Sequence, residues 1–114
     1  MKELKGIMDK EKPYLNSSLN LAELSSALDV SSKKLSQVIN QSESLNYSQF
    51  VSKYRVAEAQ ARMQNDNNRH LKIAAIAYDC GFNSISSFNA SFKKYAGTTA
   101  IAYRNSLEEK KNLM

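Results

Sequence analysis

Residues 80–95 read CGFNSISSFNASFKKY, and their spacing predicts a turn followed by a two-faced helix. Gly81 is expected to take the left-handed conformation that ends a preceding helix. At about 100° per residue, Phe88 and Phe92 fall on one side of a helix that starts near Ser84. The other side carries small polar residues and lysine without a carboxylate, whereas a solvated helix face usually mixes both signs of charge.

An internal repeat connects this stretch with residues 20–40. Apolar residues of the two segments match at an offset of 52 before the turn and 53 after it. The matched pairs are Leu21 with Ile73, Leu24 with Ile76, Leu28 with Cys80, Val30 with Phe82, Leu35 with Phe88, and Ile39 with Phe92. Each copy therefore predicts a helix, a tight turn and a second helix, which is the helix-turn-helix unit. The second turn is one residue longer.

The 114-residue chain as a whole predicts an all-α fold of seven helices. It has three glycines, one proline and no strand-like alternation of β-branched residues. A first helix is expected to end before Pro13, and Asn20 is expected to cap the next one together with Glu23. Thr99 can cap a last short helix that reaches Tyr103, and the tail from Leu107 is expected to be a frayed helical extension.

The longest periodic run, residues 47–64, predicts a linker helix of ~27 Å between the two units. Its buried face is expected to consist of Tyr47, Phe50, Val51, Tyr54, Ala57 and Ala61. Arg55 and Arg62 are expected at the surface or paired with Glu58. The chain then divides into a first helix-turn-helix subdomain (1–46), the linker helix (47–64), a second subdomain (65–107) and a tail (108–114).

Charge is distributed unevenly along the chain. The net charge is +5, but residues 31–104 alone hold ten Lys and Arg against four Asp and Glu, which gives +6. Positive charge concentrated in a folded body indicates a polyanionic partner, most often nucleic acid. No apolar run approaches the ~20 residues of a membrane span and no signal peptide opens the chain, so a cytoplasmic location without membrane contact is expected.

Catalytic and metal-binding motifs are missing from the sequence. The single histidine, His70, lies in a polar turn and is expected to be exposed, and the single cysteine, Cys80, is expected to be a buried structural thiol. One histidine and one cysteine cannot assemble a zinc site, and no phosphate-binding loop or hydrolase motif occurs. We therefore expect neither an enzyme nor a cofactor.

The second helices of the two units have the chemistry of DNA-recognition helices. Their predicted outer faces display Lys33, Ser36, Gln37 and Asn40 in the first copy, and Ser86, Asn89, Ala90 and Lys93 in the second. Amides and hydroxyls can pair with base edges, and the lack of acids suits a face beside phosphate. Double-stranded DNA is therefore the expected partner. The alternative is a helical protein-interaction module, which would explain the helices but not the two acid-free faces.

The run IAAIAYDCGFNSISSFNASFKKYAGTTAIAYR (73–104) resembles the C-terminal signature of the AraC/XylS family of bacterial transcription regulators. The segments NLAELSSALDVSSKKLSQVIN (20–40) and YSQFVSKYRVAEAQARM (47–63) match the first helix-turn-helix and the linker helix of that family. The resemblance covers about Tyr14 to Arg104. It implies a seven-helix domain that sets two recognition helices into successive major grooves on one face of DNA and regulates transcription.

The resemblance also implies roles for individual residues. Base contacts fall on Lys33, Ser36 and Gln37 in the first unit and on Ile85, Ser86, Asn89 and Ala90 in the second. Phosphate contacts fall on Lys34, Asn40, Lys93, Lys94 and Arg104. RNA polymerase is the implied protein partner, and an upstream sensor or effector domain is the implied source of the signal.

The sequence departs from the family pattern at two places. Thr99-Ala100 stands where the family usually has Ser-Pro, so a weaker start of the last helix is expected. Ile85 and Ala90 stand where many relatives carry long polar residues. The second unit is therefore expected to discriminate less between sequences, by contacts to the backbone or to thymine methyl groups.

Overall fold

The computed structural model describes residues 1–112, with side chains through residue 110. Over this range the chain forms seven α-helices, two short 3-10 helices and no strand, which confirms the expected all-α fold. The α-helices are α1 (Lys2–Lys10), α2 (Leu21–Ala27), α3 (Ser32–Glu43), α4 (Tyr47–Gln64), α5 (Ile73–Asp79), α6 (Ile85–Ala96) and α7 (Ala100–Asn112). The 3-10 helices are η1 (Pro13–Leu15) and η2 (Asp66–Asn68).

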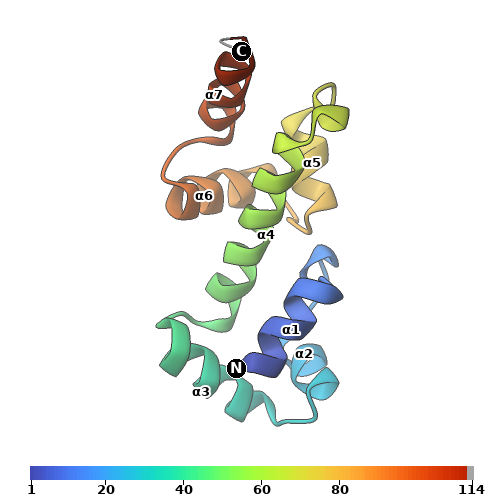
Figure 1. The fold of residues 1–114 in the computed structure, drawn as a ribbon. Coiled ribbons are helices and arrows are strands. Elements are labelled where there is room, and N and C mark those ends of the chain that lie inside the picture. Colours follow the sequence, from blue (N-terminus) through green and yellow to red (C-terminus); the bar gives the residue numbers. More distant parts are fainter. Residues whose placement is uncertain (113–114) are drawn as a thin grey trace.

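Two lobes lie at the ends of α4, and the molecule measures 49 × 26 × 23 Å (Figure 1). The first lobe contains α1, α2 and α3, and its core consists of Leu4, Met8, Tyr14, Leu24, Leu35, Ile39, Phe50 and Val51. The second lobe contains α5, α6 and α7, and its core consists of Val56, Ala59, Met63, Ile76, Ala77, Cys80, Phe82, Phe88, Phe92 and Ala100. Helix α4 contributes residues to both cores.

The buried face of α4 differs from the one predicted. Phe50 and Val51 are buried as expected, but Ala57 and Ala61 are exposed. The second half of the helix instead buries Val56, Ala59 and Met63. At 3.6 residues per turn, this second set points roughly 160° away from the first. The single-stripe prediction was wrong because α4 packs one lobe on each of two nearly opposite faces.

The two helix-turn-helix units share one backbone plan. Helices α2 and α5 both have 7 residues, and α3 and α6 both have 12. The turn between α2 and α3 closes with the Val30 N–H donating to the Ser25 carbonyl at 3.1 Å, and Phe82 donates to Ala77 at the same distance. These pairs are related by the offset of 52, so the predicted repeat is confirmed in the backbone.

Helix ends follow the predicted capping residues. The Asn20 side chain accepts from the Glu23 N–H at 2.8 Å, and Thr99 caps α7 in the same way. Ser84, for which the sequence predicted only the start of a helix, also caps α6. Gly81 and Gly97 have positive φ, at 98° and 80°. In the first turn, Asp29 occupies the position of Gly81, with φ of 56°. The left-handed position therefore carries a side chain, Asp29, in the first turn and none, at Gly81, in the second.

Helix α7 is longer than the short helix expected to end at Tyr103 and reaches Asn112. Tyr103 and Leu107 pack against the second core, so tertiary contacts extend the helix beyond its capped first turn. Residues 108–112 of the expected tail belong to this helix, and residues 113 and 114 lie outside the described residues. No described helix is both long and apolar enough to cross a membrane.

Candidate nucleic-acid interface

Helix α3 presents the first predicted DNA-contacting face. Leu35 and Ile39 are buried under the helix and fix its orientation, and Val38 is partly buried beside them. The opposite side exposes Lys33, Lys34, Gln37 and Asn40, with Ser36 partly covered. The Ser31 hydroxyl accepts from the Lys34 N–H at 3.1 Å and caps the helix at this end. The structure thus brings all five expected contact residues of α3 to accessible positions.

Helix α6 presents the second face in the equivalent way. Phe88 and Phe92 are completely buried, and Phe82 packs edge-on against Phe88 with ring centroids 5.2 Å apart. Exposed side chains on the other side belong to Ser86, Asn89, Ala90, Lys93 and Lys94. Ile85 is only partly exposed and packs against the second core.

The exposed side of α6 stands between two grooves. Ser48, Gln49 and Ser52 from the start of α4 line one groove together with α6 residues that include Ser87 and Lys94. Thr99, Ala100 and Ile101 line the other, together with Asn89 and Lys93. Ala90 borders both grooves, so it lies on the crest of a ridge. A helix that projects in this way has the form needed to enter a major groove about 12 Å wide.

The two faces have a uniform sign of charge. Helix α6 contains no Asp or Glu, and α3 contains only Glu43 in its last turn. The Glu43 carboxylate lies 3.8 Å from Lys5 Nζ. The faces therefore present lysines, amides and hydroxyls, which are groups that bind phosphate and base edges.

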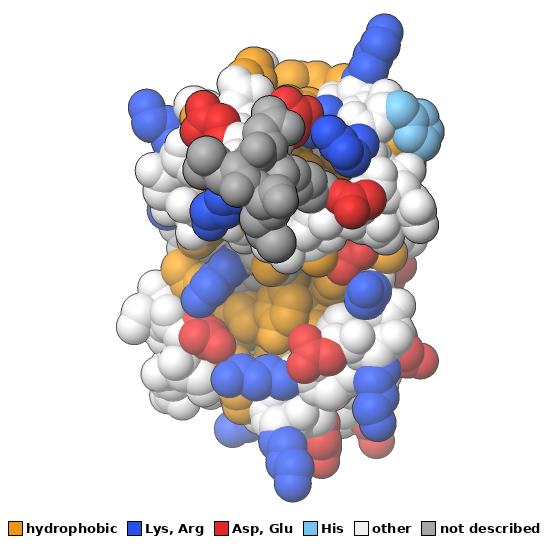
Figure 2. Space-filling view, turned by 45° about the horizontal axis from the view of Figure 1, so that its top comes forward, with side chains coloured by type: hydrophobic (Ala, Val, Ile, Leu, Met, Phe, Trp, Pro, Cys, Tyr) orange, Lys and Arg blue, Asp and Glu red, His pale blue; other side chains and the backbone are white. Residues whose placement is uncertain are grey.

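A hollow beside α4 differs from these faces. Figure 2 shows hydrophobic side chains exposed in a hollow between the two lobes, with Lys, Arg, Asp and Glu around it. A groove between α1, the end of α3 and α4 is lined by Lys5, Glu43, Phe50, Lys53, Tyr54 and Ala57. Its mixed charge does not match a polyanion.

Arg104 is not part of the exposed row of cations. Its Nη1 donates to the Leu71 carbonyl at 2.6 Å, and Nη2 is also buried. This guanidinium ties α7 to the segment before α5. The guanidinium of Arg104 is therefore engaged inside the protein, whereas the ammonium groups of Lys93 and Lys94 are exposed.

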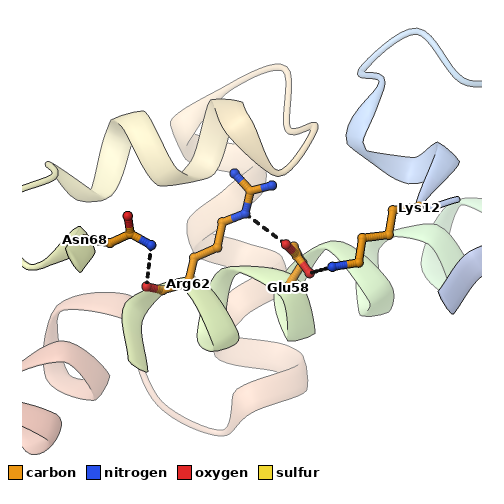
Figure 3. A network of polar contacts seen from close by, with 4 residues as sticks. All are labelled: Lys12, Glu58, Arg62 and Asn68. Carbon is orange, nitrogen blue, oxygen red and sulfur yellow. Dashed lines mark hydrogen bonds and ion pairs between the residues drawn. The ribbon is translucent and has the colours of Figure 1, made fainter. Parts of the chain in front are cut away.

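The sequence prediction missed a polar network between α4 and the first lobe (Figure 3). The Glu58 carboxylate accepts from Lys12 Nζ at 3.0 Å and from Arg62 Nε at 2.9 Å. Burial raises the pKa of Glu58, but the hydrogen bonds from Arg62 and Lys12 outweigh it and hold this pKa below its ordinary value. The expected Arg62–Glu58 pair is confirmed; the role of Lys12 is new.

Arg55 does not join Glu58. Its Nε donates to the Tyr14 carbonyl at 2.7 Å and its Nη2 to the Asn16 carbonyl at 3.0 Å. Both carbonyls belong to the loop that contains η1. No pattern in the sequence marks backbone acceptors that lie about 40 positions away, so only the three-dimensional structure finds this contact.

The remaining reactive side chains have structural positions. Cys80 is fully buried, and burial raises the pKa of its thiol to about 12, as expected for an inert structural cysteine. His70 is exposed. Within residues 1–112 no cluster of His, Cys, Asp and Glu could hold a metal ion.

Comparison with known protein families identifies the chain as a helix-turn-helix domain over a range that includes both repeated units. A sequence model described as a helix-turn-helix domain matches residues 24–106, which is most of the chain. No curated protein matches. The fold and this match define a helix-turn-helix DNA-binding domain, a class that consists of binding modules rather than enzymes. Within it, the chain belongs to the AraC-type helix-turn-helix family of transcription regulators.

Solved structures with the same fold include three bacterial proteins. The C-terminal domain of the two-component response regulator yesN from Fusobacterium nucleatum is 28% identical, with a TM-score of 0.72 and coverage of 90% of this chain and 95% of that one. The C-terminal domain of AraT, a response regulator from Geobacillus stearothermophilus, is 24% identical, with a TM-score of 0.74 and coverage of 92% and 83%. A DNA-binding transcriptional dual regulator from Escherichia coli is 23% identical, with a TM-score of 0.73 and coverage of 92% and 94%.

Proposed function

We propose that this protein binds double-stranded DNA sequence-specifically and regulates transcription, with α3 and α6 in successive major grooves. The observation that carries the proposal is the pair of acid-free, exposed faces on α3 and α6, each supported by an equivalent turn and buried apolar residues. A protein-interaction module has no need for two such matched faces, whereas a duplex offers two equivalent grooves.

The dimensions of the molecule support the two-groove arrangement. Successive major grooves on one face of B-DNA are separated by about 34 Å, one helical turn. Helix α4 has 18 residues and spans about 27 Å at 1.5 Å per residue. The units lie at its two ends, and the longest dimension of the molecule is 49 Å. One chain is thus long enough to contact two grooves.

The proposed contacts divide into two kinds. Lys33, Ser36 and Gln37 contact bases in the first groove, and Ile85, Ser86, Asn89 and Ala90 contact the second. Lys34, Asn40, Lys93 and Lys94 neutralise or hydrogen-bond phosphates. Arg104 is assigned to positioning, because its guanidinium is occupied by the Leu71 carbonyl.

Sequence discrimination is proposed to come mainly from α3. Gln37 is exposed and can pair with two atoms of adenine, while Lys33 can pair with guanine. On α6 the corresponding surface has the methyl group of Ala90 on its crest and Ile85 partly covered by the core. These apolar groups can contact thymine methyls but cannot donate a hydrogen bond.

Selection of bound sequences from a random duplex pool, followed by anisotropy measurements over a range of salt, tests the proposal. We expect two conserved blocks about one helical turn apart and affinity that falls steeply with salt, because each neutralised phosphate releases counterions. Lys93→Ala should weaken all sequences alike, and Gln37→Ala should relax preference within one block. Salt-insensitive binding to a protein with no DNA binding at low salt would favour the interaction-module alternative.

The chain is further proposed to act as the DNA-binding output of a regulator that contacts RNA polymerase. Two of the similar structures are C-terminal domains of response regulators, which supports this arrangement. The inducing signal then acts through a sensor connected to the first lobe.

A further inference from the structure

The two helix-turn-helix units contact each other directly, in addition to their connection through α4. Gly81, in the turn of the second unit, lies against the loop of the first lobe that contains η1. A Cβ at Gly81 would collide with the Tyr14 carbonyl oxygen and lie 2.8 Å from Arg55 Nε. Close by, Asn83 Nδ2 lies 3.4 Å from the Ser17 carbonyl oxygen. The second unit therefore packs against backbone of the first.

Arg55 holds this loop against the linker helix. Its guanidinium donates to two backbone carbonyls of this loop, those of Tyr14 and Asn16, at 2.7 and 3.0 Å. The guanidinium fork fixes direction as well as distance, because the donors are coplanar and charge-assisted. Burial lowers the pKa of Arg55. Arg55 Nε also lies 2.8 Å from the position that a Cβ at Gly81 would occupy, so this linker side chain bonds the first lobe and lies beside the turn of the second unit.

The Glu58 network fastens the loop at a second point. Lys12 has a left-handed backbone with φ of 48°, and its side chain reaches back to Glu58 on α4. Arg62, one turn further along α4, holds the other carboxylate oxygen. The Glu58 side chain is 12% exposed and that of Lys12 is 42% exposed, so the carboxylate is largely shielded from water while the ammonium group stays partly solvated.

We propose that these residues, which we call the waist clamp (Lys12, Tyr14, Arg55, Glu58, Arg62 and Gly81), set the spacing between the two DNA half-sites. The clamp fixes the position of α6 relative to α3 before DNA is bound. A preorganised pair of helices binds the matching spacing with little loss of conformational freedom and binds other spacings poorly. This inference rests on the proposed function. It assigns specificity to residues that contact no base.

A distance measurement in the DNA-free protein tests the clamp. Ser42 and Ser87 are exposed on α3 and α6, and Ser42→Cys with Ser87→Cys provides sites for two spin labels, while buried Cys80 is protected from labelling. Pulsed electron resonance is expected to give one narrow distance distribution. Arg55→Met should broaden it. Lys53→Met is the matched control, since it removes one charge from an exposed position of the same helix.

The selected DNA site supplies the second readout. For the parent protein, insertion of one base pair between the half-sites should weaken binding at least about tenfold. In Arg55→Met the penalty should fall to about threefold or less, with weaker binding at the natural spacing. Glu58→Gln should act in the same direction and provides the test if Arg55→Met loses helicity by circular dichroism.

The outcomes separate the two proposals. A distance distribution as narrow in both Arg55→Met and Glu58→Gln as in the parent overturns the clamp, and so does equal broadening by Lys53→Met. A parent protein that binds DNA equally well at every spacing also overturns it; double-stranded DNA binding by the chain would then still stand, but without a fixed separation of the two half-sites. If the parent binds no duplex at low salt, the proposed function fails, and the label distances still decide whether the clamp holds the units.

Discussion

The first and second helix-turn-helix units have equal helices but different surroundings at their turns. Val30 in the first turn is 41% exposed, and its counterpart Phe82 is 3% exposed. Asp29 supplies the left-handed residue of the first turn, and Gly81 supplies that of the second. The first turn faces solvent and the second packs against the loop at Tyr14. A repeated sequence therefore produces repeated backbone, while the neighbours of each copy decide which side chains the turn can carry.

The cores under the two recognition helices also differ. Leu35 and Ile39 support α3, whereas α6 rests on Phe88 and Phe92. Phe88, Phe92 and Tyr103 form a continuous row of rings with centroid separations of 5.5 and 5.6 Å. Rings of this size bury more apolar area than aliphatic side chains. The recognition helix of the second unit is thus anchored by aromatic rings, whereas α3 is anchored by aliphatic side chains.

The largest expected effect comes from emptying one of these cores. Phe88→Ala should lower the free energy of unfolding by about 3–5 kcal/mol, because it leaves a ring-sized cavity. Leu35→Ala, its counterpart in the first unit, should cost about 2–5 kcal/mol and less than Phe88→Ala. Urea denaturation followed by circular dichroism measures both. Equal losses would show that the aromatic core gives no extra stability.

The turn residues offer the next comparison. Gly81→Ala should cost about 2–5 kcal/mol, because left-handed strain and a collision with the Tyr14 carbonyl add together. Asp29→Ala should cost about 1 kcal/mol or less, because the parent already carries a Cβ in this left-handed conformation and the substitution removes only the local hydrogen bonding that lets Asp tolerate it. Thermal unfolding measures the pair. A loss at Asp29 that matches the loss at Gly81 would contradict the difference between the two turns.

The recognition helices should differ in how strongly one amide contributes to DNA binding. Gln37→Ala is expected to lose about 1–3 kcal/mol of discrimination at one base pair. Asn89→Ala should lose less, because its neighbours on α6 are Ile85 and Ala90. Competition binding against single-base variants of the selected site measures this loss. A larger loss of discrimination in Asn89→Ala than in Gln37→Ala would contradict the proposal that α3 discriminates more between sequences than α6.

Acidification should produce the smallest effect, about 1 kcal/mol or less for this pair of salt bridges. The pKa of Glu58 is lowered in the folded protein, so its stabilisation is fully present above its ordinary pKa of 4.5 and is lost as the pH falls toward the lowered value. The free energy of unfolding of the parent and of Glu58→Gln, followed below pH 5, should converge. Parallel curves would show that Glu58 contributes no pH dependence.

Much of the fold could be predicted because its signals are local. The six matched apolar pairs define the two units, and the caps at Asn20, Ser84 and Thr99 act within one turn of their own helices. The buried face of α4 could not be predicted from one periodicity, because a helix between two cores satisfies two periodic patterns at once. The length of α7 likewise depends on contacts with a distant core.

The candidate site divides in the same way. Exposure of Lys33, Gln37 and Asn89 follows from helix geometry once the buried residues are known. The position of Arg104 cannot be deduced from helix geometry, because tertiary folding brings the Leu71 carbonyl to its guanidinium. Arg55 is the clearest case: its partners are backbone oxygens, which every residue has and no sequence pattern marks.

The opposed faces of α4 have a consequence for how the molecule comes apart. Phe50 and Val51 complete one core, and Val56, Ala59 and Met63 complete the other. Cutting the chain on either side of α4 would leave one unit without a wall of its core, so neither unit has a natural boundary at which it could be excised whole. The loss of α4 helicity removes support from both cores in one event. The two units are therefore expected to unfold together, as a single cooperative body.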